Sequence, residues 1–128
     1  MESETILIVD DNKEIVHSLG ELLKLEGYRI ETAYDGMEAL QIVEKEDIHL
    51  ILMDIMMPVM DGLEATRHIR SMNRRDSMTI PIVAMSANAF QEDVEKSLAA
   101  GLNEHLTKPL DEKKFTETMK KYLGKKMR

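Results

Sequence analysis

The sequence predicts an α/β domain in which helices cover both faces of a parallel sheet. Three observations support this prediction. Short aliphatic runs alternate along the chain with segments of helical periodicity, which is typical of successive βαβ units. Three of these runs are almost continuously apolar, as strands buried on both faces usually are. The 128 residues have the length of a single domain, 1–128, with a core expected over about 4–123.

Five apolar segments are predicted to be strands. The three most apolar are residues 6–9 (ILIV), 49–53 (HLILM) and 80–85 (IPIVAM), which are expected to be buried inside the sheet. Residues 29–33 (RIETA) and 105–107 (HLT) contain more polar side chains, so they suit the edges of the sheet. No internal repeat, linker or low-complexity segment interrupts this order.

Five helices are predicted from apolar residues that recur three and four positions apart. They occupy the segment between Asn12 and Gly27, and about 36–45, 63–72, 88–100 and 111–123. The first helix has Asp11 or Asn12 as its candidate N-cap and Gly27 as its stop signal. In the fourth, Leu98 is expected to face inward. Residues 124–128 (GKKMR) are expected to form a frayed basic tail.

Composition and charge exclude several classes of protein. The chain has 17 Lys and Arg against 24 Asp and Glu, a net charge of −7, which argues against a nucleic-acid-binding surface. It has no Cys, so a disulfide framework, a thiolate zinc site and a cysteine nucleophile are excluded. Neither a signal peptide nor an apolar run of ~20 residues is found, so we expect a cytoplasmic domain without direct membrane contact.

Complementary polar side chains follow four of the five predicted strands. Asp10 and Asp11 come after the first strand, Asp54 after the third, Ser86 after the fourth and Lys108 after the fifth. Ligands of open α/β sheets bind outside the carboxyl ends of the strands, where the strand order reverses. If the first and third strands are neighbours, the three carboxylates converge at that edge of the sheet.

This set of side chains is suited to phosphoryl chemistry. Three like charges within a few ångströms repel one another and should raise at least one carboxyl pKa. A hard divalent cation such as Mg²⁺ would relieve this repulsion and bridge to phosphate oxygens, while a lysine and a hydroxyl would hold the remaining oxygens. The reaction that fits is attack of a carboxylate on phosphorus to give an aspartyl phosphate. It needs no general base, because Asp is already ionised at neutral pH.

Four motifs resemble those of the receiver, or phospho-acceptor, domain of two-component response regulators. They are ILIVDDN at 6–12, LMDIMMPVMDG at 52–62, PIVAMSA at 81–87 and LTKPL at 106–110. All four in this order and at these spacings are highly specific, and the resemblance covers essentially the whole chain. It implies a flavodoxin-like (βα)5 fold, doubly wound, with five parallel strands in the order 2-1-3-4-5.

The resemblance also implies a metal-dependent phosphorylation site. Asp54 would be the phosphorylated carboxylate, and Asp11, Asp54 and the backbone carbonyl of Met56 would bind Mg²⁺ directly. Asp10 would bind the metal through water, and Mn²⁺ would be able to replace Mg²⁺. Acid or amide side chains are common at the position of Met56. We therefore hypothesise that this bulky apolar side chain shields the acyl phosphate from water; the alternative is that it only packs within its loop.

Two further positions are implied to bind and sense the phosphoryl group. Ser86 would donate a hydrogen bond to a phosphoryl oxygen and Lys108 would pair with the phosphate, while Lys108-Pro109 stands where the family often has a cis peptide. The family usually has Tyr or Phe three residues before this lysine, where this chain has His105. We expect a conventional site with a modified switch, in which His105 is either a polar, pH-sensitive contact or a strand residue without special role.

The resemblance implies partners as well. The phosphoryl group would come from a phosphohistidine on a histidine kinase or histidine phosphotransfer domain, and an effector would bind the face of the fourth helix, fifth strand and fifth helix. AMSANA at 84–89 and GLNEHLTKP at 101–109 are most similar to receivers of hybrid sensor histidine kinases. The domain would be free-standing or part of such a kinase, which can tether it to a membrane. Alone, it would catalyse only its own phosphorylation and dephosphorylation.

Two alternatives remain open. A Mg²⁺-dependent phosphohydrolase that forms an aspartyl phosphate commonly has two Asp residues two positions apart after the first strand, whereas Asp10 and Asp11 are adjacent here. The other alternative is a non-phosphorylated interaction module or a flavin-binding relative. Degenerate receivers lose an acid or the lysine, which this chain retains, and the acidic segment after the first strand would repel a flavin phosphate.

Overall fold

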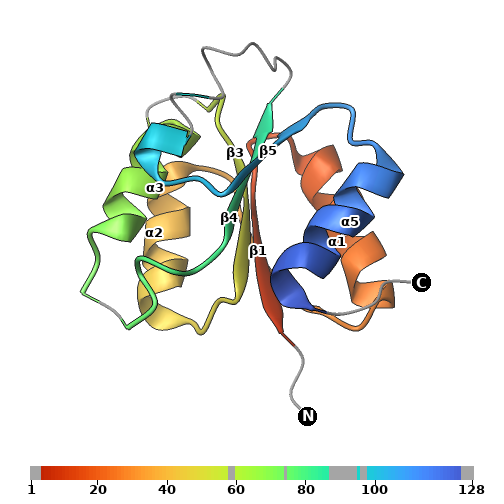
Figure 1. Cartoon of the computed structure of the whole chain (residues 1–128), viewed down its shortest axis with the longest axis horizontal. Coiled ribbons are helices and arrows are strands. Elements are labelled where there is room, and N and C mark those ends of the chain that lie inside the picture. Colours follow the sequence, from red (N-terminus) through yellow and green to blue (C-terminus); the bar gives the residue numbers. More distant parts are fainter. Residues whose placement is uncertain (1–3, 58–59, 74, 87–94, 96–97, 125–128) are drawn as a thin grey trace.

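The computed structural model describes residues 4–57, 60–73, 75–86, 95 and 98–124. A twisted sheet of parallel strands runs through the middle of the molecule (Figure 1). Its strands are β1 (Thr5–Val9), β2 (Arg29–Ala33), β3 (Leu50–Asp54), β4 (Ile82–Ser86) and β5 (Glu104–Thr107). They are arranged in the order β2-β1-β3-β4-β5, which confirms the expected doubly wound topology.

Helices cover both faces of this sheet. They are α1 (Lys13–Leu25), α2 (Gly36–Lys45), α3 (Gly62–Arg70) and α5 (Glu112–Leu123). α1 and α5 lie on one face, and α2 and α3 lie on the other (Figure 1). None of the helices in the described ranges is both long enough and apolar enough to span a bilayer.

The expected fourth helix, 88–100, lies mostly outside the described residues. Within it, residue 95 and residues 98–100 are helical. Leu98 is 56% exposed, so the expectation that it faces inward is wrong, whereas Ala100 is buried. Residues two apart in a helix point to nearly opposite sides, so Leu98 and Ala100 cannot both face the core. The predicted basic tail also lies outside the described residues from 125 onward.

Side chains along each strand point alternately to the two faces of the sheet, which divides the core into two clusters. Leu7 and Val9 of β1 pack with α2 and α3, while Ile6 and Ile8 pack with α1 and α5. Because successive side chains point to opposite faces, one strand supplies both cores. The strands β1, β3 and β4 are buried throughout, as their apolar sequences predict.

Each described helix begins at an Asn or Asp whose side chain accepts a backbone N–H bond. These N-caps are Asn12, Asp35, Asp61 and Asp111. At α1, Oδ1 of Asn12 accepts from the N–H groups of Glu14 and Ile15, at 3.0 and 3.3 Å. Asn12 rather than Asp11 is therefore the cap, and the Asp11 carboxylate is left available to the strand edge.

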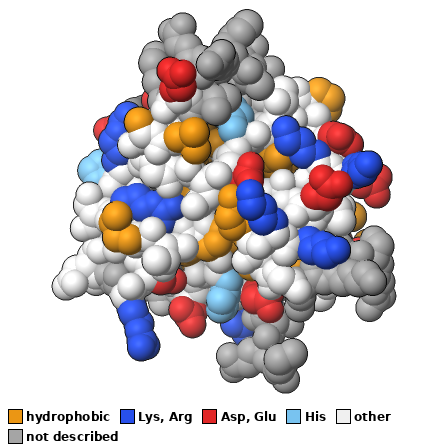
Figure 2. Space-filling model, in the orientation of Figure 1, with side chains coloured by type: hydrophobic (Ala, Val, Ile, Leu, Met, Phe, Trp, Pro, Cys, Tyr) orange, Lys and Arg blue, Asp and Glu red, His pale blue; other side chains and the backbone are white. Residues whose placement is uncertain are grey.

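Strand register aligns the predicted polar residues at one edge of the sheet. Val9 of β1 lies opposite Met53 of β3, so Asp10 and Asp54 follow them side by side. Asp54 and Ser86 are the last residues of β3 and β4 rather than the first residues after them. The surface view in Figure 2 shows Lys and Arg interspersed with Asp and Glu, so this face carries no continuous basic patch.

Candidate functional site

Three carboxylates meet at the carboxyl ends of β1 and β3. One oxygen of each of Asp10, Asp11 and Asp54 lies within 4.8 Å of the others. Asp10 and Asp54 are buried, at 0% and 3% exposure, whereas Asp11 is exposed. Hard oxygen donors arranged in this way suit a divalent cation such as Mg²⁺, and the exposed Asp11 leaves a side open to solvent.

The buried Asp10 carboxylate is fully engaged. Its Oδ1 accepts a hydrogen bond from the backbone N–H of Asn12 at 2.9 Å. Its Oδ2 accepts one at 2.8 Å from Nζ of Lys108, which follows the edge strand β5. A buried carboxylate is tolerated only with such compensation, so Lys108 balances the charge of Asp10.

Asp54 is less well compensated than Asp10. Its Oδ1 accepts a hydrogen bond from the Met56 N–H at 3.1 Å and lies 3.5 Å from Nζ of Lys108. Burial, and secondarily the charge of Asp10, raises the pKa of Asp54 to about 6, against the opposing effects of the Met56 N–H and Lys108. The side chain is thus ionised at neutral pH but destabilised in that form, which suits a group awaiting a cation.

This raised pKa predicts how stability depends on pH. The Asp54 pKa is about 6 in the fold against an ordinary value of 3.8. Its ionisation therefore leaves the free energy of unfolding unchanged below pH 3.8 and lowers it by the full amount above pH 6. In EDTA at pH 7, Asp54→Asn should therefore raise the free energy of unfolding by roughly 1–3 kcal/mol. The gain should shrink as pH falls from 6 to 4. Urea unfolding across pH measures it, with the exposed Asp47→Asn as control; a pH-independent gain would contradict the assignment.

Ser86 and Lys108 are brought together at the ends of β4 and β5. Ser86 is 2% exposed and lies opposite Thr107 in the sheet. Its carbonyl accepts the Lys108 N–H at 2.7 Å, and the Lys108-Pro109 peptide is cis, as expected. A hydroxyl-bearing residue and the lysine thus lie at the same strand edge as the carboxylates.

The two remaining predicted residues lie beside this cluster. Met56 is 67% exposed and touches the site through its backbone N–H. His105 is half-buried in β5, opposite Ala84 of β4, and does not belong to the acidic cluster. The structure therefore brings together the acids and the lysine but leaves His105 within the sheet.

Gly62 is a site-forming residue that sequence reasoning missed. A Cβ at this position would lie 2.4 Å from the carbonyl oxygen of Asp54 and 2.7 Å from Cα of Ile55. The Gly62 N–H also donates to the Ile55 carbonyl at 3.3 Å, which closes the loop after β3. A glycine at the first position of α3, where alanine is the better helix former, was the available signal.

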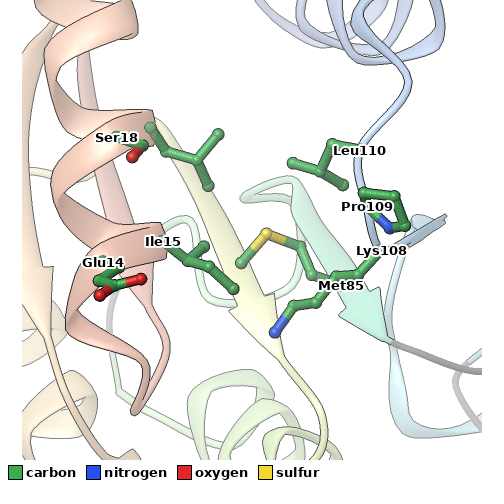
Figure 3. A pocket seen from close by; sticks show the side chains of 8 residues that line it. Glu14, Ile15, Ser18, Met85, Lys108, Pro109 and Leu110 are labelled. Atoms are coloured by element: carbon green, nitrogen blue, oxygen red, sulfur yellow. The ribbon is translucent and has the colours of Figure 1, made fainter.

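A partly apolar groove opens next to Lys108. It has a volume of about 340 Å³ and lies between α1 and the segment after β5. Figure 3 shows Ile15 and Met85 facing Leu110 and Pro109 across this space, with Lys108 at its rim. The groove therefore offers a contact surface beside the acidic cluster.

Curated relatives include parts of large kinases and a protein of the same size. The chain is 40% identical over 116 residues to hybrid signal transduction histidine kinase B of Dictyostelium discoideum, covering 84% of this chain and 6% of that protein. It is 32% identical over 122 residues to the polar-differentiation response regulator DivK of Brucella ovis, covering 95% of this chain and 98% of that protein. The chain thus spans only a small fraction of the kinases that it matches.

Solved structures are similar over nearly the whole chain. One is the receiver domain of sensor histidine kinase PA1611 from Pseudomonas aeruginosa with magnesium coordinated in its active-site cleft (TM-score 0.85, 35% identity, 97% of this chain and 100% of that one). Another is the receiver domain of the Saccharomyces cerevisiae response regulator Ssk1, crystallised with the histidine phosphotransfer protein Ypd1 (TM-score 0.85, 31% identity, 94% of this chain and 88% of that one). The sequence profile of the response regulator receiver domain matches residues 6–120.

Proposed function

The chain belongs to the response regulator receiver domain family, and we propose that it accepts a phosphoryl group from a phosphohistidine onto Asp54 in a Mg²⁺-dependent reaction. One observation carries this proposal. The acidic cluster and Lys108 converge from the ends of β1, β3 and β5, so that the carboxylate with the raised pKa lies close to two further carboxylates and 3.5 Å from an ammonium.

The proposed metal site consists of oxygen donors. Asp11, Asp54 and the backbone carbonyl of Met56 would bind Mg²⁺, and Asp10 would bind it through water. The clustering of the three carboxylates supports this, as does the magnesium in the similar PA1611 receiver. Bound Mg²⁺ would neutralise charge on the transferring phosphoryl group, and Mn²⁺ prefers similar oxygen ligands.

In the proposed reaction an Asp54 oxygen attacks the phosphorus of the phosphohistidine. A P–O bond forms while the P–N bond breaks, and the imidazole nitrogen keeps the electron pair. Nζ of Lys108, now 3.5 Å from Oδ1 of Asp54, would bind a phosphoryl oxygen, and the Ser86 hydroxyl would donate to another. Asp54 needs no base, because it is already ionised above pH 6.

The proposed donor is a histidine kinase or a histidine phosphotransfer domain. The Ssk1 complex supports a phosphotransfer partner, and the hybrid kinase relative supports a kinase. The groove formed by Ile15, Met85 and Leu110 beside Lys108 would accept an apolar side chain of such a donor. This function belongs in the cytoplasm, where ATP charges histidine kinases, whether the domain is free-standing or tethered through a parent sensor kinase.

The proposed output is a change on the face of the fourth helix, β5 and α5, where an effector would bind. Movement of Ser86 toward the phosphate would be felt at His105, which we expect to act as a polar contact rather than a bulky rotamer switch. Amide chemical shifts of native protein and His105→Tyr, each with and without phosphorylation, test this. The tyrosine variant should perturb β5 more strongly, and identical perturbations would contradict a special role of the histidine.

Intact-mass analysis tests the function. With acetyl phosphate and Mg²⁺, the native protein should gain one phosphoryl group, and it should gain none in EDTA or as Asp54→Ala. Absence of any gain would favour a non-phosphorylated interaction module. Steady multi-turnover hydrolysis of a phosphate ester would instead favour a phosphohydrolase.

The exposed Met56 side chain gives a prediction about lifetime. It lies two residues after Asp54, is 67% exposed, and would exclude attacking water if it covered the acyl phosphate. Met56→Asn should speed loss of the phosphoryl group about tenfold, the effect of losing ~1.4 kcal/mol of protection from water. The exposed Met78→Asn, outside the site, is the control. Equal dephosphorylation rates in all three proteins would rule out shielding.

A further inference from the structure

We propose that Gly36, at the start of α2, is a positioning residue for Asp54. It lets Met60 pack against the start of α2, and this contact holds the backbone around Gly62 that lies against Asp54. The inference rests on the proposed function, because the quantity it governs is phosphoryl transfer to Asp54.

The contact between Gly36 and Met60 leaves no room for a side chain. Gly36 is buried, and a Cβ there would lie 2.9 Å from Cγ of Met60 and 3.0 Å from both its Sδ and its carbonyl oxygen. The side-chain atoms of Met60 can turn aside, but its carbonyl oxygen cannot, so the backbone at Met60 must give by a few tenths of an ångström. Met60 is partly buried and packs against the core between α2 and α3.

The α2 side of this contact is held firmly. Oδ1 of Asp35 accepts the Glu38 N–H at 2.8 Å, and Oε1 of Glu38 accepts the Tyr34 N–H at 3.0 Å. These reciprocal bonds cap the helix and fix the approach of the preceding chain. A clash at Gly36 would therefore displace Met60 rather than α2.

A displacement of Met60 would reach the backbone of the proposed acceptor, Asp54. Met60 lies two residues before Gly62, whose α-carbon sits so close to Asp54 that a Cβ would be 2.4 Å from its carbonyl oxygen. Between them, Oδ1 of Asp61 accepts the Glu64 N–H at 2.9 Å and fixes the start of α3. Movement at Met60 therefore passes through Asp61 and Gly62 to the backbone of Asp54 and Ile55, next to the Met56 N–H that binds the Asp54 carboxylate.

Gly36→Ala tests the inference, with Gly20→Ala as the matched control. Gly20 is also buried in a helix, but a Cβ there would meet only Cγ2 of Ile30 at 3.8 Å, an ordinary contact. The initial rate of phosphorylation by acetyl phosphate is measured against Mg²⁺ concentration, alongside the free energy of unfolding. Gly36→Ala should need five- to tenfold more Mg²⁺ or react five- to tenfold more slowly. Gly20→Ala should behave as the native protein.

Met60→Ala supplies a test of the contact itself. In the native background it removes packing against Gly36, and should lower the rate about twofold. In the Gly36→Ala background it removes most of the clash, and should raise the rate. Failure of Met60→Ala to change the rate in the native background overturns the inference even if Gly36→Ala does not fold. So does a native rate and Mg²⁺ dependence in a folded Gly36→Ala.

These outcomes are separable from the proposed function. If the native protein takes up no phosphoryl group at Asp54, the proposed function fails and the role of Gly36 in it fails too. If the native protein and Gly36→Ala are phosphorylated alike, only the positioning role is lost.

Discussion

Lys108→Met is expected to lower the free energy of unfolding by about 3 kcal/mol in metal-free buffer, because it removes one partner of a buried charge pair. Nζ of Lys108 donates to Oδ2 of Asp10 at 2.8 Å, and the Asp10 side chain is fully buried. Methionine keeps the unbranched shape of the side chain up to the ε position but lacks the ammonium group. The Asp10 carboxylate would then be left with the Asn12 N–H alone among these contacts.

Added Mg²⁺ should recover much of this loss, since the cation would supply the missing positive charge. Urea unfolding in EDTA and in Mg²⁺ measures both effects. Lys121→Met is the matched control, because Lys121 bonds Glu104 at 2.7 Å on the surface, where ion pairs contribute little. If Lys108→Met costs no more than the control in EDTA, the charge-balancing role of Lys108 is contradicted.

The same variant should also slow phosphorylation. Lys108 is the described ammonium that reaches both Asp10 and Asp54, so its loss removes a donor for the phosphoryl oxygens. Removing one donor of this kind typically slows a reaction about 100-fold. Initial rates with acetyl phosphate at saturating Mg²⁺ measure the effect, again with Lys121→Met as control.

Gly62→Ala is expected to destabilise the protein by about 3 kcal/mol, at the upper end of the usual range for overpacking. The added methyl group would have to displace the Asp54 carbonyl oxygen, 2.4 Å away, and Cγ of Met53, 2.9 Å away. The Asp54 oxygen belongs to the backbone and Met53 is fully buried in β3, so neither can rotate out of the way as an exposed side-chain end could.

Gly20→Ala separates this effect from helix propensity. Alanine is favoured over glycine inside a helix by about 0.5–1 kcal/mol, and the Gly20 site has room for the methyl group. This control should therefore be as stable as the native protein or slightly more so. Thermal and urea unfolding of the two variants provide the comparison, and equal stabilities would mean that the backbone at Asp54 yields easily.

The strands and most helices could be predicted because the spacing of apolar residues along the chain follows from which side chains are buried. The continuous apolar runs became the fully buried β1, β3 and β4, and the helix predicted over 36–45 begins and ends at those residues. The ends of the strands were predicted less accurately. β3 and β4 each extend one residue beyond the predicted end, to Asp54 and Ser86. Polar side chains mark the edge of an apolar run, but backbone hydrogen bonds decide where a strand stops.

The members of the candidate site could be predicted because parallel strands end at the same edge of a sheet. Asp10, Asp54 and Lys108 are recognisable as polar residues at these ends. What the sequence could not reveal is which partner each one takes. The pairing of Lys108 with Asp10 more closely than with Asp54, and the roles of Gly36 and Gly62, depend on distances between backbone segments far apart in the chain.

The location of the phosphoryl group tests the central claim most directly. Borohydride reduction converts an aspartyl phosphate to homoserine. The tryptic peptide 46–67 contains Asp47, Asp54 and Asp61, and the tryptic peptide 1–13 contains Asp10 and Asp11. After phosphorylation with acetyl phosphate and Mg²⁺, peptide fragmentation should find homoserine at position 54 and aspartate at position 61. Homoserine at Asp10, Asp11 or Asp61, or unmodified aspartate at position 54 in protein that has gained a phosphoryl group, would contradict the assignment of Asp54 as the acceptor.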